Sequence, residues 1–169
     1  MTALTDSIVA LLLRELRALR REVEAFPDER DLWRLLPGLA NSTGTLTLHV
    51  AGSVQHFAGA RLAGSPYVRD RVHEFAARDL SRERLLQEVE AAMAAVQQLA
   101  AALDGADLGR PFPETVAQLR IETADFLLHM CTHVAYHLGQ VDYHRRAVTG
   151  STSGVSAVGL AELKTARPV

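Results

Sequence analysis

The sequence predicts an all-α fold, a four-helix bundle with a long crossover between its second and third helices. Good helix formers (Ala, Leu, Arg, Glu and Gln) dominate the 169 residues, while aromatic residues make up only 5%. β-branched residues do not cluster in alternating runs, so no sheet is expected. Four stretches instead carry apolar residues every three or four positions, and each is long enough for about six helical turns. Long helices of this number and length typically form a bundle.

The first helix is predicted over residues 4–26. Its apolar residues recur at helical spacing and are separated by arginines and glutamates: Leu4, Ile8, Leu12, Leu16, Leu19 and Val23. Pro27 and the charged residues 28–31 end it. A connector follows, and Asn41 or Ser42 is the expected N-cap of the second helix.

The second helix is predicted to reach Leu62, ahead of Gly64-Ser65-Pro66. The next connection, residues 63–80, is charged and too long for a tight turn between antiparallel helices. We therefore expect a crossover here. Ser81 is the predicted cap of the third helix, which extends to Leu103, with Leu80 and Leu85 as a hydrophobic staple across the cap.

The fourth helix is predicted over residues 123–148, before Gly150. Residues 107–122 should be irregular because they contain two prolines, and Val116–Ile121 is ambiguous between strand and helix. We expect residues 1–150 to form one metal-binding bundle domain. Residues 151–169 should be a weakly structured tail with at most one short helix, near Gly159–Lys164.

Composition excludes several classes of protein. The net charge is −2 and there is no basic tract, so we expect no nucleic-acid partner. No apolar run is long enough to span a membrane, and the N-terminal apolar stretch contains charges, so neither a membrane span nor a secretory signal is expected. The single cysteine, Cys131, rules out an internal disulfide and fits a cytoplasmic protein.

Histidines concentrate in the fourth helix. The stretch DFLLHMCTHVAYHLGQVDYHRR holds four of the seven in the chain, and each residue of a helix turns about 100°. All four therefore fall in one sector with Gln140, at the edge of the buried face: His129, His133, His137 and His144. On the second helix, His49 likewise shares its face with small and polar residues: Ser42, Thr45, Gly52, Ser53 and His56.

This pattern is compatible with a metal site. His133 and His137 are four residues apart on a helix, so both rings can reach one cation, and His49 would complete a three-histidine set. Neutral imidazole suits Zn, Ni, Fe or Cu, and three protein ligands leave positions open for water or substrate. The alternative is a metal-free polar bundle whose histidines only form hydrogen bonds. Neither the Glu-x-x-His of di-iron bundles nor the His-Glu-x-x-His of zinc proteases occurs.

The remaining residues of interest have structural interpretations. His144 should lie towards the end of the bundle, and His56 should line a pocket or stabilise the fold. His73 lies in the charged connector and should be solvated. Cys131 points away from the histidine sector, so we expect a small core residue. Gly139 should permit close approach of a neighbouring helix.

Two motifs resemble those of a known family. NSTGTLTLHVAG in the second helix and LLHMCTHVAYHLGQVDYHRR in the fourth, with Trp33 ahead of Asn41-Ser42, resemble the DinB/YfiT-like superfamily of metal-dependent enzymes. The similarity covers the order and length of all four helices. It implies a divalent transition metal held by His49, His133 and His137, with Zn or Ni expected first and Fe or Mn as alternatives.

The resemblance also implies an activity. Family members include S-transferases that use bacillithiol, a mycothiol-dependent maleylpyruvate isomerase and relatives that use glutathione. We therefore expect an enzyme that acts on a small-molecule thiol and an electrophilic substrate. A metal-dependent hydrolase and a non-enzymatic metal-binding module are the alternatives. We also expect a homodimer. His129 is the candidate outer-shell partner or proton shuttle, unless it is a fourth ligand. Gln140 could bind a ligand or pack at the helix interface.

Overall fold

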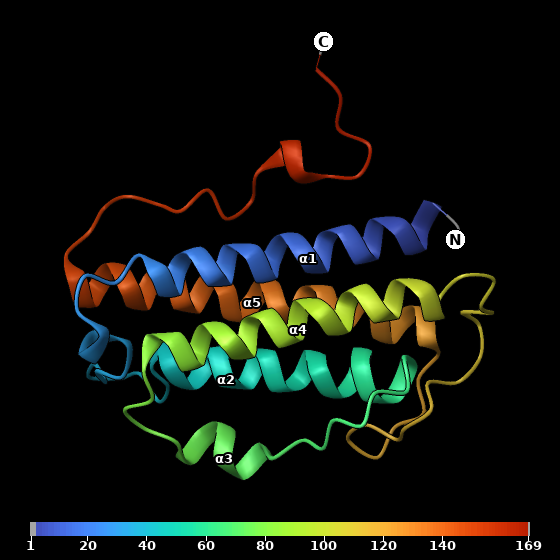
Figure 1. Cartoon of the computed structure of the whole chain (residues 1–169), viewed down its shortest axis with the longest axis horizontal. Helices are drawn as coiled ribbons and strands as arrows, with labels where there is room; N and C mark the ends of the chain where they lie inside the picture. Colours follow the sequence, from blue (N-terminus) through green and yellow to red (C-terminus); the bar gives the residue numbers. More distant parts are fainter. Residues whose placement is uncertain (1–2, 169) are drawn as a thin grey trace.

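The computed structural model describes residues 3–168, which form an all-α bundle of four long helices (Figure 1). The second of them continues from an α-helix into a π-helix, η2 (Gln55–Leu62), and so reaches Leu62 as predicted. The predicted fold class is confirmed. The helices of the bundle are α1 (Ala3–Glu24), α2 (Thr43–Val54) with its continuation η2, α4 (Arg82–Ala102) and α5 (Thr123–Thr149).

The helix ends follow the capping residues in the sequence. The hydroxyl of Ser42 accepts a hydrogen bond from the backbone N–H of Thr45 at 3.3 Å, which fixes the start of α2. Ser81 caps α4 in the same way, on the N–H of Arg84 at 3.2 Å. Gly150 ends α5 with a φ of 73°, a left-handed conformation that glycine adopts without a Cβ clash.

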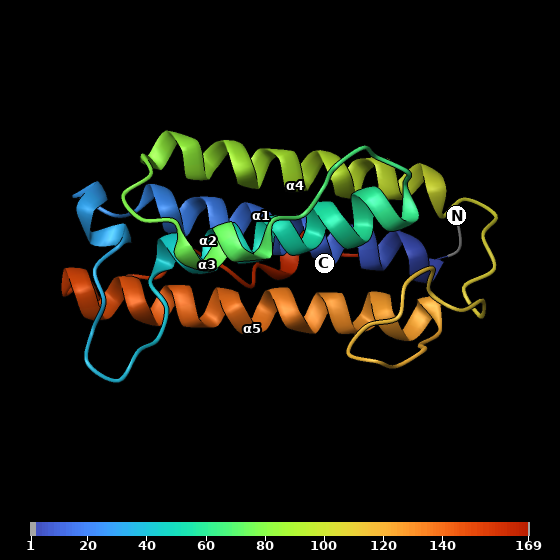
Figure 2. The ribbon, with the colours of Figure 1, turned by 90° about the horizontal axis from the view of Figure 1, so that it is seen from below.

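The order of the helices creates the crossover. α1 packs on α4 and α5, and α2 packs on the same two helices. Because α2 and α4 run in the same direction, residues 63–81 return along the length of the bundle (Figures 1 and 2). This confirms the predicted crossover. The connection also contains a short helix, α3 (Arg71–Ala76), which packs on α2 and was not predicted.

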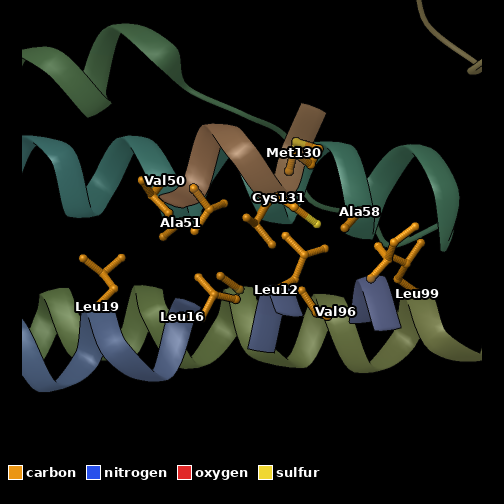
Figure 3. Close-up of a cluster of buried hydrophobic side chains, with 14 of the residues drawn as sticks. Leu12, Leu16, Leu19, Val50, Ala51, Ala58, Val96, Leu99, Met130 and Cys131 are labelled. Atoms are coloured by element: carbon orange, nitrogen blue, oxygen red, sulfur yellow. The ribbon is translucent and has the colours of Figure 1, made fainter. Parts of the chain in front are cut away.

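The main core lies between the helices (Figure 3). Its largest residues are leucines and phenylalanines with at most 2% of their surface exposed, including Leu12, Leu16 and Phe126. Each such side chain contributes about 1.5–3 kcal/mol of transfer free energy. A second cluster surrounds Trp33, whose indole N–H donates to the carbonyl oxygen of Leu80 at 2.9 Å.

Outside the four helices, the chain is stabilised by turns and ion pairs. The 3₁₀-helix η1 (Glu29–Leu32) follows α1. Val116–Ile121 is neither strand nor helix, which corrects both alternatives: Val116 and Leu119 close a turn through one isolated bridge. The tail contains one 3₁₀ turn, η3 (Leu160–Glu162) (Figure 1). Arg17 contacts Glu162 of this turn at 3.1 Å. None of the helices between residues 3 and 168 has the length and apolarity needed to cross a membrane.

Candidate metal centre

Three histidines from two helices converge between α2 and α5. One ring nitrogen each of His49, His133 and His137 lies within 4.8 Å of the other two, so this cluster could hold a metal ion. These are the three residues that the sequence singles out. His49 is buried, whereas His133 and His137 are half-buried. His133 and His137 are one turn apart, with ring centroids 4.6 Å from one another.

The spacing of the donor atoms fits a small cation. Nε2 of His49 lies 3.3 Å from Nε2 of His133. At a Zn–N distance of about 2.1 Å, two ligands of a tetrahedral site are about 3.4 Å apart, so this pair already has the required separation. Two facing ring nitrogens at this distance can share one proton or bind one cation. The imidazole set also suits the chemistry of zinc and nickel.

His49 is held by a buried ion-pair network. Its Nδ1 lies 3.0 Å from Oε2 of Glu74. Arg69 donates to both carboxylate oxygens, from Nε to Oε1 at 2.6 Å and from Nη2 to Oε2 at 2.8 Å. Nη2 of Arg69 also lies 3.3 Å from Nδ1 of His49, but it is closer to Oε2 of Glu74. Because the nearer partner of Nδ1 is an ionised carboxylate, which only accepts, we assign the proton of His49 to Nδ1 and the lone pair that faces His133 to Nε2. A carboxylate behind a histidine is the arrangement that orients metal-binding imidazoles.

The electrostatics of Glu74 keep it ionised. Burial opposes ionisation, but the hydrogen bonds from Arg69 and His49 outweigh it and lower the pKa of Glu74 below its ordinary value. Gly52 makes room for this carboxyl group: a Cβ on Gly52 would overlap Oε1 of Glu74. Gly139, in contrast, was predicted to permit close approach of a neighbouring helix, and this prediction is wrong. Gly139 is exposed, and a Cβ added there would have no atom within 4 Å.

Sequence reasoning missed Glu74 and Arg69. Both lie in the crossover, which has no long apolar period and was interpreted only as a charged connector. The available signal was local: Asp70 caps α3 by accepting from the N–H of His73. The next residue, Glu74, is the buried residue of this short helix, which packs on α2. His73 lies on the exposed side, as predicted.

His137 is held by Gln140. Nδ1 of His137 lies 2.7 Å from Oε1 of Gln140, one turn further along α5. An amide oxygen accepts, so Nδ1–H donates and Nε2 is left with the lone pair. The candidate catalytic residue Gln140 therefore contacts a member of the cluster directly.

The cluster favours neutral imidazoles. Burial, together with the charges of His137, His49, His129 and Arg69, lowers the pKa of His133 to about 4. Burial also lowers the pKa of His137, and the hydrogen bond that His137 donates to Gln140 only partly offsets it. Neutral rings have free lone pairs at neutral pH, which is the form that binds a cation.

The other histidines behave differently. His144 is buried and both of its nitrogens are bonded, Nδ1 to the hydroxyl of Thr43 at 2.9 Å and Nε2 to the carbonyl oxygen of Arg34 at 2.7 Å. His56 bonds Glu114 at 2.9 Å and so fixes the 107–122 segment. Nδ1 of His133, in contrast, is buried without a hydrogen-bond partner among residues 3–168. His144 and His56 therefore bond groups outside the cluster, whereas the hydrogen-bond contact of His133 is with His49.

His129 lies outside the cluster. Its ring centroid is 6.0 Å from that of His133, one turn away, and the residue is exposed. It lines a cavity of about 220 Å³ that also reaches His49 and His133. Larger cavities lie elsewhere, including one of about 440 Å³ beside Gln140 and Tyr143, but neither His49 nor His133 lines that one.

Cys131 is buried in the core as predicted, and burial raises its thiol pKa to about 11.

Comparison with known proteins identifies the family. A family model described as the DinB superfamily matches residues 11–141, a range that includes all three histidines of the cluster. No curated protein and no solved structure matches the chain significantly. The match covers most of the chain and agrees with the helical bundle and its histidine cluster. The chain belongs to the DinB superfamily.

Proposed function

We propose that the protein binds one divalent transition metal through His49, His133 and His137 and acts on a small-molecule thiol. Zn or Ni is the expected metal, with Fe or Mn as alternatives. The observation that supports this is the arrangement around His49: a buried carboxylate, itself bonded twice by Arg69, directs Nε2 of His49 towards His133. A carboxylate that holds the proton on Nδ1 leaves the lone pair of Nε2 available to a cation, which is the usual arrangement of metal-binding histidines.

The proposed reaction is the transfer of a thiol to an electrophile. When bound, the cation supplies a Lewis acid that lowers the pKa of a thiol or water at an open position. The thiol gives up its proton, its sulfur forms a bond to the electrophilic carbon, and the leaving group departs with the bonding electron pair. An isomerase of this type adds the thiol and later expels it.

The chain's own residues would divide the remaining tasks. Glu74 and Gln140 are positioning residues, because each bonds the Nδ1–H of a cluster histidine and so fixes which nitrogen faces the site. His129, on the rim of the cavity, is the proposed acceptor of the thiol proton. Its imidazole is exposed, so it can exchange that proton with water.

Titration of the cobalt-substituted protein with thiols tests this proposal. Thiolate ligation adds a sulfur-to-metal charge-transfer band, so bacillithiol, mycothiol, glutathione and cysteine are compared. We expect a band with at least one of them, lost in His137→Ala. His129→Ala should keep the metal and the band but slow turnover. No band with any of the four, in protein that holds one metal per chain, would reject thiol transfer and favour hydrolysis or a non-enzymatic role.

A further inference from the structure

The cavity beside the histidine cluster carries basic side chains in its wall. Two arginines of the crossover, Arg69 and Arg71, line it, and none of the described residues that line it is acidic. Their charges are not equivalent. Arg69 is compensated, because both oxygens of Glu74 accept hydrogen bonds from its guanidinium.

Arg71 is the uncompensated charge. Within residues 3–168 it makes no ion pair, and its recorded contact is with an aromatic ring: the guanidinium carbon lies 5.0 Å from the ring centroid of Phe75. The Phe75 ring in turn lies 4.9 Å from the ring of His49. Arg71 thus lines the cavity while it rests on the Phe75 ring, which in turn contacts His49 of the histidine cluster. Its planar donors remain free to bind an oxyanion.

The rest of the wall is part polar and part apolar. Ser53 and the three histidines His49, His129 and His133 form the polar part. Phe57, Phe126, Met130 and Val116 form the apolar part, and the rings of Phe57 and Phe126 are 4.9 Å apart. With about 220 Å³, the cavity is below the ~300–1,000 Å³ of typical drug-sized sites, so its ligand must be small. A pocket with one free guanidinium at its edge and aromatic walls selects a short molecule with a negative end and an apolar body.

We propose that this cavity is a carboxylate subsite, in which Arg71 binds the carboxylate of a small substrate whose apolar part lies against Phe57 and Phe126. That the bound carboxylate is a substrate rests on the proposed function, because His49 and His133 line the same cavity. Its binding step requires only residues of the chain. It can therefore be tested with the metal-free protein, so that a failure of metal or thiol binding does not decide it.

The experiment uses three probes that share one body and differ in charge: 3-phenylpropionate, 3-phenylpropanamide and 3-phenylpropylamine. Their binding to the full-length metal-free protein is measured by ligand-observed NMR at pH 7.5. A charge-assisted pair of hydrogen bonds at a half-open site is worth roughly a factor of ten in affinity. We expect the carboxylate to bind about tenfold more tightly than the amide, and the amine to bind most weakly.

Variants locate the preference. Arg71→Gln should remove the advantage of the carboxylate over the amide, and Arg71→Lys should retain part of it. Arg120→Gln is the matched control. Arg120 is exposed, makes no ion pair with the residues that the structure describes and does not line this cavity. The Arg120→Gln protein should bind all three probes as the unmodified protein does. The proposal is overturned if carboxylate and amide bind equally, if the preference survives Arg71→Gln, or if the carboxylate fails to bind at tens of millimolar. Circular dichroism confirms that each variant is folded.

Discussion

Replacing Glu74 by glutamine should weaken metal binding without touching a ligand. Glu74 accepts three hydrogen bonds through two oxygens, one from His49 and two from Arg69. Glutamine has the same shape but only one oxygen, so either His49 or Arg69 must face an amide N–H₂ group. In one orientation His49 loses the acceptor that fixes its proton on Nδ1, and in the other Arg69 loses one of its two bonds to that acceptor.

The magnitude follows from the position of this carboxylate. Loss of an outer partner of a metal-binding histidine costs about 10- to 100-fold in metal affinity, or roughly 1.4–2.7 kcal/mol. The upper part of this range is expected, because the His49 and Glu74 side chains are only 7% and 5% exposed and water cannot replace the lost bond.

Competition with a chromophoric chelator at pH 7.5 measures this affinity. The chain contains a matched control: Glu114 also joins a histidine and an arginine, His56 and Arg61, but outside the cluster. Glu114→Gln should leave zinc affinity unchanged. Unaltered zinc affinity in Glu74→Gln, or an equal loss in Glu114→Gln, would refute the role assigned to Glu74.

Three further predictions concern packing, pH and association. Gly52→Ala places a Cβ against Glu74, so it should lower zinc affinity and should lower the free energy of urea unfolding by about 1–3 kcal/mol. Gly139→Ala fills open space in a helix and should raise the free energy of unfolding by about 0.5–1 kcal/mol. A Gly52→Ala protein more stable than Gly139→Ala would contradict the packing described. In the metal-free protein, the pKa values of His133 and His137 are lowered by folding, so between pH 6.5 and 4 the unfolded chain binds more protons than the folded chain does. The free energy of unfolding should therefore decrease as the pH falls through this range, and these two groups should leave it unchanged above the range. A constant free energy of unfolding between pH 6.5 and 4 would argue against buried neutral rings. We also predict a homodimer, and light scattering that shows only monomer at micromolar concentration would reject it.

The sequence predicted the bundle well because helical periodicity and capping residues are local signals. Leu12, Leu16 and Leu19 mark one face of α1, and Ser42 and Ser81 set helix starts by bonds within three residues. The three histidines of the cluster were also predictable, since two are one turn apart and the third shares a face with small residues.

The surroundings of the cluster were not predictable in the same way. Glu74 acts through contacts with His49, 25 positions away in sequence, and lies on a helix of six residues that has no apolar period of its own. Arg71 could be distinguished from Arg69 only by knowing which one meets Glu74. Gly139 and Gly52 look alike in the sequence, since either could permit close approach of another element. Only the position of α3, which brings Glu74 against Gly52, shows that Gly52 is the one in close contact.

We expect His49, His133 and His137 to hold one metal ion together. Elemental analysis of tag-free protein tests it most directly, applied to the unmodified chain, to His49→Ala, His133→Ala and His137→Ala, and to His73→Ala as an exposed control. We predict one divalent transition metal per chain in the unmodified protein and in His73→Ala, and no stoichiometric metal in each of the other three. Full metal content in all three cluster variants would contradict the assignment.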